Sequence, residues 1–161
     1  MFNYWLIKSE PTTYSIDQLK RDGFSTWEGV RNFQARNYMR DVMKVGDLAL
    51  FYHSNEKPPG VAGVCRICKE AFPDFTAWNP ESPYYDPRAT SEKPIWVMVE
   101  VEFVEKFPSL VTLDTLKRHP ELQDLYILRS RSRLSIIPLE KKHFEIIRAL
   151  GRQEARLLHV Q

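Results

Sequence analysis

The chain has 161 residues, 43% of them hydrophobic and 27% charged, a composition typical of a folded globular protein that excludes a wholly disordered chain. No stretch approaches the ~20 apolar residues of a membrane-spanning helix, and two cysteines are too few for a disulfide scaffold, so we expect one cytoplasmic domain over residues 1–161. The net charge of +2 is a weak argument for a polyanionic partner, although the positive charges concentrate toward the C-terminus.

The N-terminal third predicts one strand and two helices. An apolar run at residues 3–7 predicts a short strand. Ser15 and Gln18 have the spacing of a capping box, which begins a helix that Gly23 ends. A second helix follows Asn32 as its cap, because apolar residues recur on one face. These residues are Ala35, Tyr38, Met39, Val42 and Met43.

The remainder of the chain predicts mostly strands. Runs rich in apolar and β-branched residues predict strands at residues 48–52, 61–68, 95–104 and 134–139. Two short helices are expected at residues 112–118 and 140–150, the second ended by Gly151. Because strands and helices do not alternate as βαβ units, the sequence predicts an α+β fold with a small mixed β-barrel and disfavours a doubly wound nucleotide-binding fold.

Residues 72–94 form a long connection rich in proline and aromatic residues. Connections longer than ~15 residues without regular structure are usually functional or disordered, and the aromatic content argues against disorder. We therefore expect this segment to pack over the body of the protein as a lid or a wall.

Cys65 and Cys68 match the C-x-x-C spacing of redox and zinc sites. On a strand, however, residues three apart point to opposite faces, and no second cysteine pair exists to complete a zinc cluster. We interpret both as structural cysteines. The four histidines also lack metal-binding spacing, so the sequence predicts no metal and no cofactor, with only His53 in a polar loop of interest.

The segment from Trp27 to Arg36 combines groups that suit a base or a phosphate. Trp27 offers a stacking face, Gly29 permits close approach to the backbone, and polar side chains surround the start of a helix. The alternative is a capped helix beside a core tryptophan, since aromatic residues at such positions usually serve packing.

Two further clusters have the same ambiguity. Residues 52–55 are four consecutive hydrogen-bonding side chains after an apolar strand, which suit either a binding loop or an ordinary loop. Arg129, Arg131 and Arg133 alternate with serine, so an extended backbone would put them on one face. That face could follow a phosphate backbone or form a solvated strand edge.

Together these clusters resemble the EVE domain family over nearly the whole chain. The motifs are YWLIKSEP from Tyr4, WEGVRNFQAR from Trp27, FYHSN from Phe51, PGV from Pro59, PYYDP from Pro83 and RLSIIP from Arg133. The resemblance implies a PUA-like fold, a small twisted β-barrel with helices against it, related to the YTH readers of methylated adenine in RNA. It also implies an aromatic pocket that accepts a modified base outside the stack, with modified cytosine in DNA as the favoured ligand.

Carried over by position, the resemblance implies a set of base-pocket residues, with Trp27 as the stacking wall. They are Lys8, Ser9, Trp27, Gly29, Val30, Asn32, His53, Ser54, Asn55, Tyr85 and Asp86. The candidate phosphate contacts, chosen mainly by charge, are Arg31, Arg36, Arg131 and Arg133.

We therefore expect a monomeric, non-enzymatic module that binds nucleic acid containing a modified base. One alternative is an enzyme that processes a modified nucleoside with His53 as its base. The other is an RNA-directed module, since recognition of the 2′-hydroxyl cannot be read from a sequence.

Overall fold

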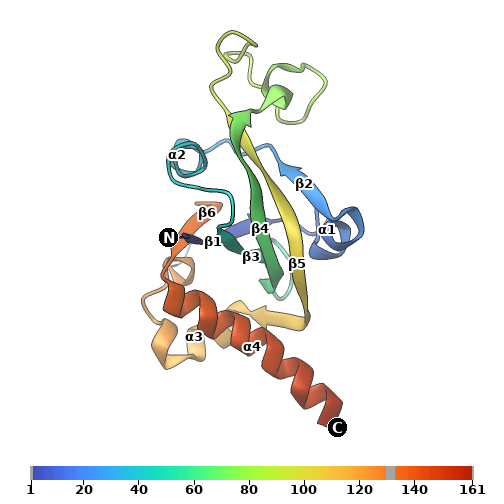
Figure 1. Cartoon of the computed structure of the whole chain (residues 1–161), viewed down its shortest axis with the longest axis vertical. Helices are drawn as coiled ribbons and strands as arrows, with labels where there is room; N and C mark the ends of the chain where they lie inside the picture. Colours follow the sequence, from blue (N-terminus) through green and yellow to red (C-terminus); the bar gives the residue numbers. More distant parts are fainter. Residues whose placement is uncertain (1, 130–132, 161) are drawn as a thin grey trace.

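The computed structural model describes residues 2–129 and 133–160, with residues 154–160 described by their helical backbone only. One mixed sheet forms the centre of the molecule, with the strand order β2-β5-β4-β3-β1-β6 (Figure 1). Its strands are β1 (Tyr4–Ser9), β2 (Phe24–Trp27), β3 (Leu48–His53), β4 (Gly60–Pro73), β5 (Val97–Thr112) and β6 (Ile136–Leu139). The helices are α1 (Ile16–Asp22), α2 (Phe33–Asp41), α3 (Leu113–Arg118) and α4 (Lys141–Val160), with 3₁₀ turns η1 (Phe75–Trp78), η2 (Pro120–Leu122) and η3 (Tyr126–Leu128).

The mixed sheet with helices packed around it confirms the predicted α+β class. Strands β1 and β3 pair in parallel, and the other neighbouring strands pair antiparallel. The parallel register sets Lys8 opposite Tyr52 and Ser9 opposite His53. The ends of two predicted strands therefore lie side by side.

Local capping signals confirm two predicted helix starts. The Ser15 side chain accepts from the backbone N–H of Gln18, whose side chain accepts in turn from the N–H of Ser15, completing the capping box of α1. The Asn32 side chain accepts from the N–H of Ala35 at 2.9 Å and begins α2.

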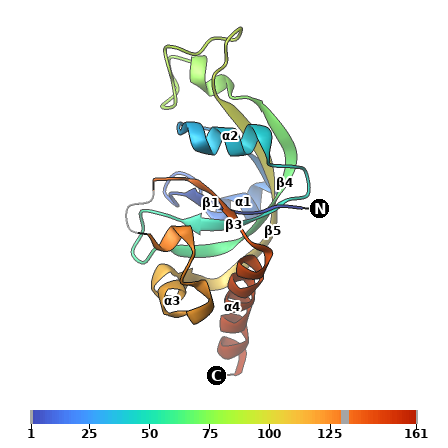
Figure 2. The same ribbon diagram turned by 90° about the vertical axis from the view of Figure 1, so that its left-hand side faces the viewer.

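The β4–β5 ribbon is longer than the sequence predicts, extending well beyond the sheet core (Figure 2). Its pairing contains several register shifts, which bend and twist a long ribbon. The extra residues lack a continuous apolar pattern, because Lys69 and Glu70 are solvent-facing, and so they gave no strand signal.

Two sequence predictions were wrong. The helix predicted for residues 140–150 continues past Gly151 to Val160. Gly151 serves close packing and does not end the helix, since a β-carbon there would be only 2.5 Å from the Phe107 ring. Trp27, expected in a turn, ends strand β2 opposite Val99. Strand β2 was missed because four residues are too few for a clear periodic pattern.

The insertion between β4 and β5 projects from one end of the ribbon (Figures 1 and 2). It contains η1 and a small apolar cluster of its own, formed by Ala77, Ala89 and Trp96. The proline-rich segment thus has packing of its own, and it lies at the end of the ribbon nearest to α2 (Figures 1 and 2).

Candidate functional site

A polar cavity of about 440 Å³ opens where the ends of β1 and β2 meet the insertion. Six of the residues expected at the site line it: Lys8, Ser9, Trp27, Gly29, Val30 and Arg31. Eight further residues complete the lining: Glu10, Thr13, Tyr14, Ser25, Thr26, Glu28, Tyr84 and Ser135. The volume falls within the range of roughly 300–1,000 Å³ that is usual for small-molecule sites.

Trp27 is held firmly in the wall of this cavity. Its ring packs edge-on against Phe51, with ring centres 5.4 Å apart, and only 8% of the residue is exposed. The indole is therefore part of the core and reaches the cavity with a small part of its surface. Its position is fixed before any ligand arrives.

Gly29 and Tyr84 both line the cavity and lie in contact with each other. Gly29 has a φ of +81°, a left-handed conformation that favours glycine. A β-carbon on Gly29 would lie 2.6 Å from the Tyr84 ring, so the ring rests directly on the glycine backbone. This contact brings Tyr84 of the insertion against the loop that follows β2.

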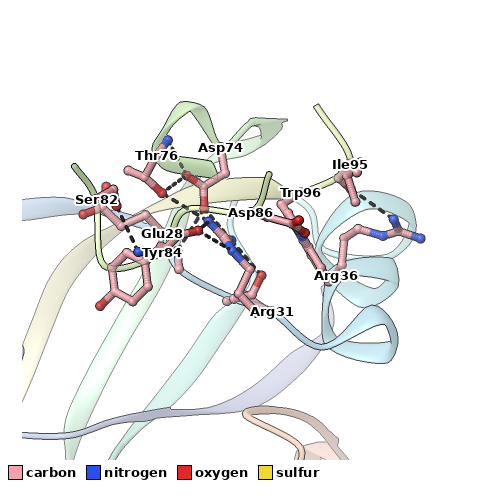
Figure 3. Close-up of polar contacts among 12 residues, drawn as sticks. Glu28, Arg31, Arg36, Asp74, Thr76, Ser82, Tyr84, Asp86, Ile95 and Trp96 are labelled. Carbon is pink, nitrogen blue, oxygen red and sulfur yellow. Dashed lines mark hydrogen bonds and ion pairs between the residues drawn. The ribbon is translucent and has the colours of Figure 1, made fainter. Parts of the chain in front are cut away.

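Arg31 joins the same two segments through a partly buried network (Figure 3). Its Nη1 forms an ion pair with Asp74 at 3.0 Å, and its Nε and Nη2 donate to the carbonyl of Tyr84 at 3.0 and 2.8 Å. Asp74 also accepts from the N–H of Gly29 at 2.9 Å. The charge of Arg31, which is 22% exposed, is thus paired with the fully buried carboxylate of Asp74.

The lining is polar but nearly neutral. Among the lining residues, Lys8 and Arg31 carry positive charges and Glu10 and Glu28 carry negative charges, so the formal charges of the lining sum to zero. Burial lowers the pKa of Lys8, and the hydroxyl of Ser9 donates to the carbonyl of Tyr14 at 2.6 Å. Such a surface suits an uncharged polar group better than a phosphate.

Four of the residues expected in the base pocket lie around α1, α2 and the β3–β4 loop and do not line the cavity. Asn32 uses its side-chain oxygen to cap α2. His53 is buried beneath α1, where its Nε2 accepts from the backbone N–H of Ile16 at 3.1 Å. Ser54 and Asn55 continue past His53 in the loop before β4, where Asn55 has a φ of +54°.

The geometry of His53 also bears on its suggested role as a base. Its Nε2 lone pair is occupied by the backbone hydrogen bond, and its Nδ1 lies 3.6 Å from Glu56. Burial lowers the pKa of His53, which favours the neutral ring that this hydrogen bond requires.

Tyr85 and Asp86, which were also expected in the base pocket, do not line the cavity. Tyr85 is exposed, whereas Asp86 accepts from the indole of Trp96 at 2.8 Å and pairs with Arg88. Hydrogen bonds from Arg88 and Trp96 hold the pKa of Asp86 far below its usual range. Tyr84, one position earlier, occupies the cavity side instead.

The arginines expected to contact phosphate differ in their surroundings. Arg36 donates to the carbonyl of Ile95 at 3.0 Å and to the side chain of Asn37, and its guanidinium lies over the rings of Phe33 and Trp96. These partners are uncharged, so they leave its charge available. Arg133 is exposed, and Arg131 lies outside the described residues.

Sequence reasoning missed several lining residues for identifiable reasons. Ser25 and Thr26 belong to the unpredicted strand β2, and Tyr84 shares a loop without periodicity with Tyr85. Ser135 belongs to the RLSIIP motif, and its carbonyl accepts from the N–H of Lys8 at 2.9 Å. That motif was the one available signal for its position.

A second cavity, of about 570 Å³, lies near the N-terminus. Its wall is mainly aromatic and aliphatic, and the indole N–H of its Trp5 donates to buried Asp47 at 3.0 Å. The cavity at Trp27 offers more hydroxyl, backbone and charged groups, so we take it as the candidate site.

The structure also bears on the cysteines, on metal binding and on membrane-spanning helices. Cys65 and Cys68 are free thiols, and burial raises the pKa of Cys65 far above its usual range. Across residues 2–129 and 133–160, no group of three or more potential ligands is arranged to hold a metal ion. No helix in that part of the chain has the length and hydropathy needed to span a bilayer.

Comparisons with known proteins give consistent relatives. The sequence model of the EVE domain matches residues 3–150. Human thymocyte nuclear protein 1 is 39% identical over 94% of this chain and 75% of its own length. A protein from Leishmania major of solved structure is 45% identical, with a TM-score of 0.92 over 96% of this chain and 98% of that one.

A further solved structure includes a ligand. Human THYN1 protein, in complex with DNA containing 5-methylcytosine, is 39% identical to this chain, with a TM-score of 0.85 over 92% of this chain and 97% of that one. The sequence matches and the structural matches both cover nearly the whole chain, and they point to the same family. The chain belongs to the EVE domain family.

Proposed function

We propose that this protein binds DNA through a modified cytosine, which leaves the base stack and enters the cavity beside Trp27. The observation that carries the proposal is the pairing of a polar, nearly neutral cavity of about 440 Å³ with 39% identity to a protein solved with DNA that contains 5-methylcytosine. A base is an uncharged, polar, flat ring, and the cavity offers groups of matching chemistry.

In this proposal, aromatic side chains stack on the base and polar groups form hydrogen bonds with its edge. Trp27 and Tyr84 supply aromatic surface, worth ~1–3 kcal/mol per stacked base. Lys8, Ser9 and Ser135, at neighbouring strand ends, supply polar groups for the edge of the base. Asn32 and His53 do not touch the base in this proposal. Asn32 caps α2, and His53 accepts a hydrogen bond from the backbone of Ile16 at the start of α1.

Phosphate contacts come from outside the cavity. Arg36 and Arg133 take this role, because the charge of Arg31 is already neutralised by Asp74. With a net charge of only +2, the protein binds unmodified DNA weakly, so most useful affinity comes from the base.

The test is a titration of the protein with labelled oligonucleotides of one sequence. The set contains duplex DNA with one 5-methylcytosine, its unmodified twin, the two corresponding single strands, and an RNA of the same sequence. The proposal expects the tightest binding for methylated DNA. Equal affinity for methylated and unmodified DNA overturns it, and preference for RNA favours the RNA-directed alternative.

A pair of lysine variants locates the binding. Lys8→Met removes a charge from the cavity, whereas Lys141→Met removes one from the second cavity. We expect only the first to weaken the preference for methylated DNA.

A further inference from the structure

Asp74, the first residue of the insertion after β4, has a completely buried carboxylate that connects two separate segments. Its Oδ1 accepts from the N–H and the hydroxyl of Thr76, within the insertion. Its Oδ2 accepts from the N–H of Gly29 at 2.9 Å and from Nη1 of Arg31 at 3.0 Å, both in the loop after β2. Each oxygen therefore serves a different segment.

Arg31 extends this connection to the cavity wall. Two of its nitrogens donate to the carbonyl of Tyr84 (Figure 3). The Tyr84 ring rests on Gly29. Asp74 thus contacts both the residue under the ring and the residue that holds the Tyr84 backbone. Hydrogen bonds with fixed directions at both points define where the ring stands.

We infer that Asp74 is a positioning residue for base recognition, acting through Arg31 to hold Tyr84 as a wall of the cavity. The inference rests on the proposed function and deepens it, since it assigns the recognition wall to Tyr84 and its placement to the ion pair between Arg31 and the buried Asp74. A buried charge is costly to desolvate, and apolar side chains could fill the same space. Directional placement of Tyr84 is what the carboxylate adds.

Asp74→Asn is the most selective variant. The amide oxygen can keep the contacts to Thr76, but the amide nitrogen then meets two donors, the N–H of Gly29 and the guanidinium of Arg31. The matched control is Asp47→Asn, since Asp47 is equally buried and accepts from Asn3, Trp5 and Lys44 beside the other cavity.

The measurement is the ratio of Kd values for unmodified and 5-methylcytosine DNA. We expect Asp74→Asn to reduce this ratio about tenfold, which is the loss of one stacked wall, while Asp47→Asn leaves it unchanged. In a Tyr84→Ala background, Asp74→Asn should have no further effect on the ratio. Tyr84→Phe should retain the ratio, because the contact of Arg31 is to the backbone.

Three results would overturn the inference while leaving the proposed function intact. The first is that Asp74→Asn and Asp47→Asn change the ratio of Kd values equally. The second is that Asp74→Asn and Tyr84→Ala change this ratio additively, and the third is that Asp74→Asn leaves it unchanged. If the wild-type protein itself shows no preference for methylated DNA, the proposed function fails, and the inference fails with it.

A second variant covers the case in which Asp74→Asn does not fold. Arg31→Lys keeps a positive charge beside Asp74 but cannot make the two parallel contacts to the carbonyl of Tyr84. It should lower the ratio and speed amide hydrogen exchange at residues 82–86. An unchanged ratio and unchanged exchange contradict the inference.

Discussion

The ring of Tyr84 lies so close to the backbone of Gly29 that a β-carbon there would be 2.6 Å from it, although the two residues are 55 positions apart in the sequence. Gly29 also has a φ of +81°, so two independent constraints select glycine. This contact joins the insertion to the loop after β2 at the cavity.

Gly29→Ala should lower the free energy of unfolding by more than Gly23→Ala. Both positions have a left-handed φ, which costs a side chain about 1–2 kcal/mol, but a β-carbon on Gly23 meets nothing within 4 Å. Urea unfolding of the two variants separates backbone strain from the clash with Tyr84. In a Tyr84→Ala background the excess cost at Gly29 should disappear, and its persistence would mean that the ring is not the cause.

The hydrogen bond from Ile16 N–H to His53 Nε2 predicts a pH dependence of stability. Burial lowers the folded-state pKa of His53 below its ordinary value of about 6.5, so its contribution is complete above that pH and is lost as the pH falls through the folded pKa. His53→Gln keeps an acceptor without titrating. Relative to this variant, the wild type should therefore lose stability as the pH falls from 8 to 5, whereas a constant difference in unfolding free energy would contradict the assignment.

Arg31→Gln should mainly lower stability, whereas Arg36→Gln should mainly weaken DNA binding. Arg31→Gln leaves the Asp74 carboxylate buried without its partner, and stability should fall by about 3–5 kcal/mol. Arg36→Gln should leave stability nearly unchanged. It should weaken the binding of methylated and unmodified DNA equally, and it should reduce the slope of log affinity against log salt concentration by about one. Binding titrations at several salt concentrations and chemical unfolding distinguish the two; an unaltered salt dependence in Arg36→Gln removes Arg36 from the proposed phosphate contacts.

The two cysteines should react very differently with a thiol reagent. Cys65 is buried, and desolvation raises its pKa, whereas Cys68 is partly exposed. Desolvation and the nearby Glu102 and Glu100 raise the pKa of Cys68 as well, so its reaction at neutral pH should be slow. Native protein should therefore label at Cys68 alone, with Cys65 reacting only after unfolding; rapid labelling of both would contradict the described packing.

Signals that act over a few residues could be predicted from the sequence. The capping box at Ser15 and the cap at Asn32 depend on contacts three residues apart, and both were found. The strands of the core were also found, because their apolar pattern continues through the buried part of the sheet.

The composition of the cavity depends on contacts between distant segments, which local patterns do not encode. Asp74 and Arg31 are brought together only when the insertion folds back onto the loop after β2. Tyr84 and Tyr85 are equivalent in the sequence, and only the path of an irregular loop directs the first to the cavity. In the sequence, His53 looks like a binding residue because it is polar and follows a strand, but in the structure it lies beneath α1 and accepts from the N–H of Ile16.

The central claim is that Trp27 contributes a wall of a site for modified cytosine. The most direct measurement is the ratio of Kd values for unmodified and 5-methylcytosine duplexes in wild-type protein, in Trp27→Leu, and in Trp78→Leu, which changes a tryptophan of the insertion away from the cavity. We predict a clear preference for methylated DNA in the wild type and in Trp78→Leu, and its loss in Trp27→Leu. A folded Trp27→Leu variant that keeps the full preference would contradict the account.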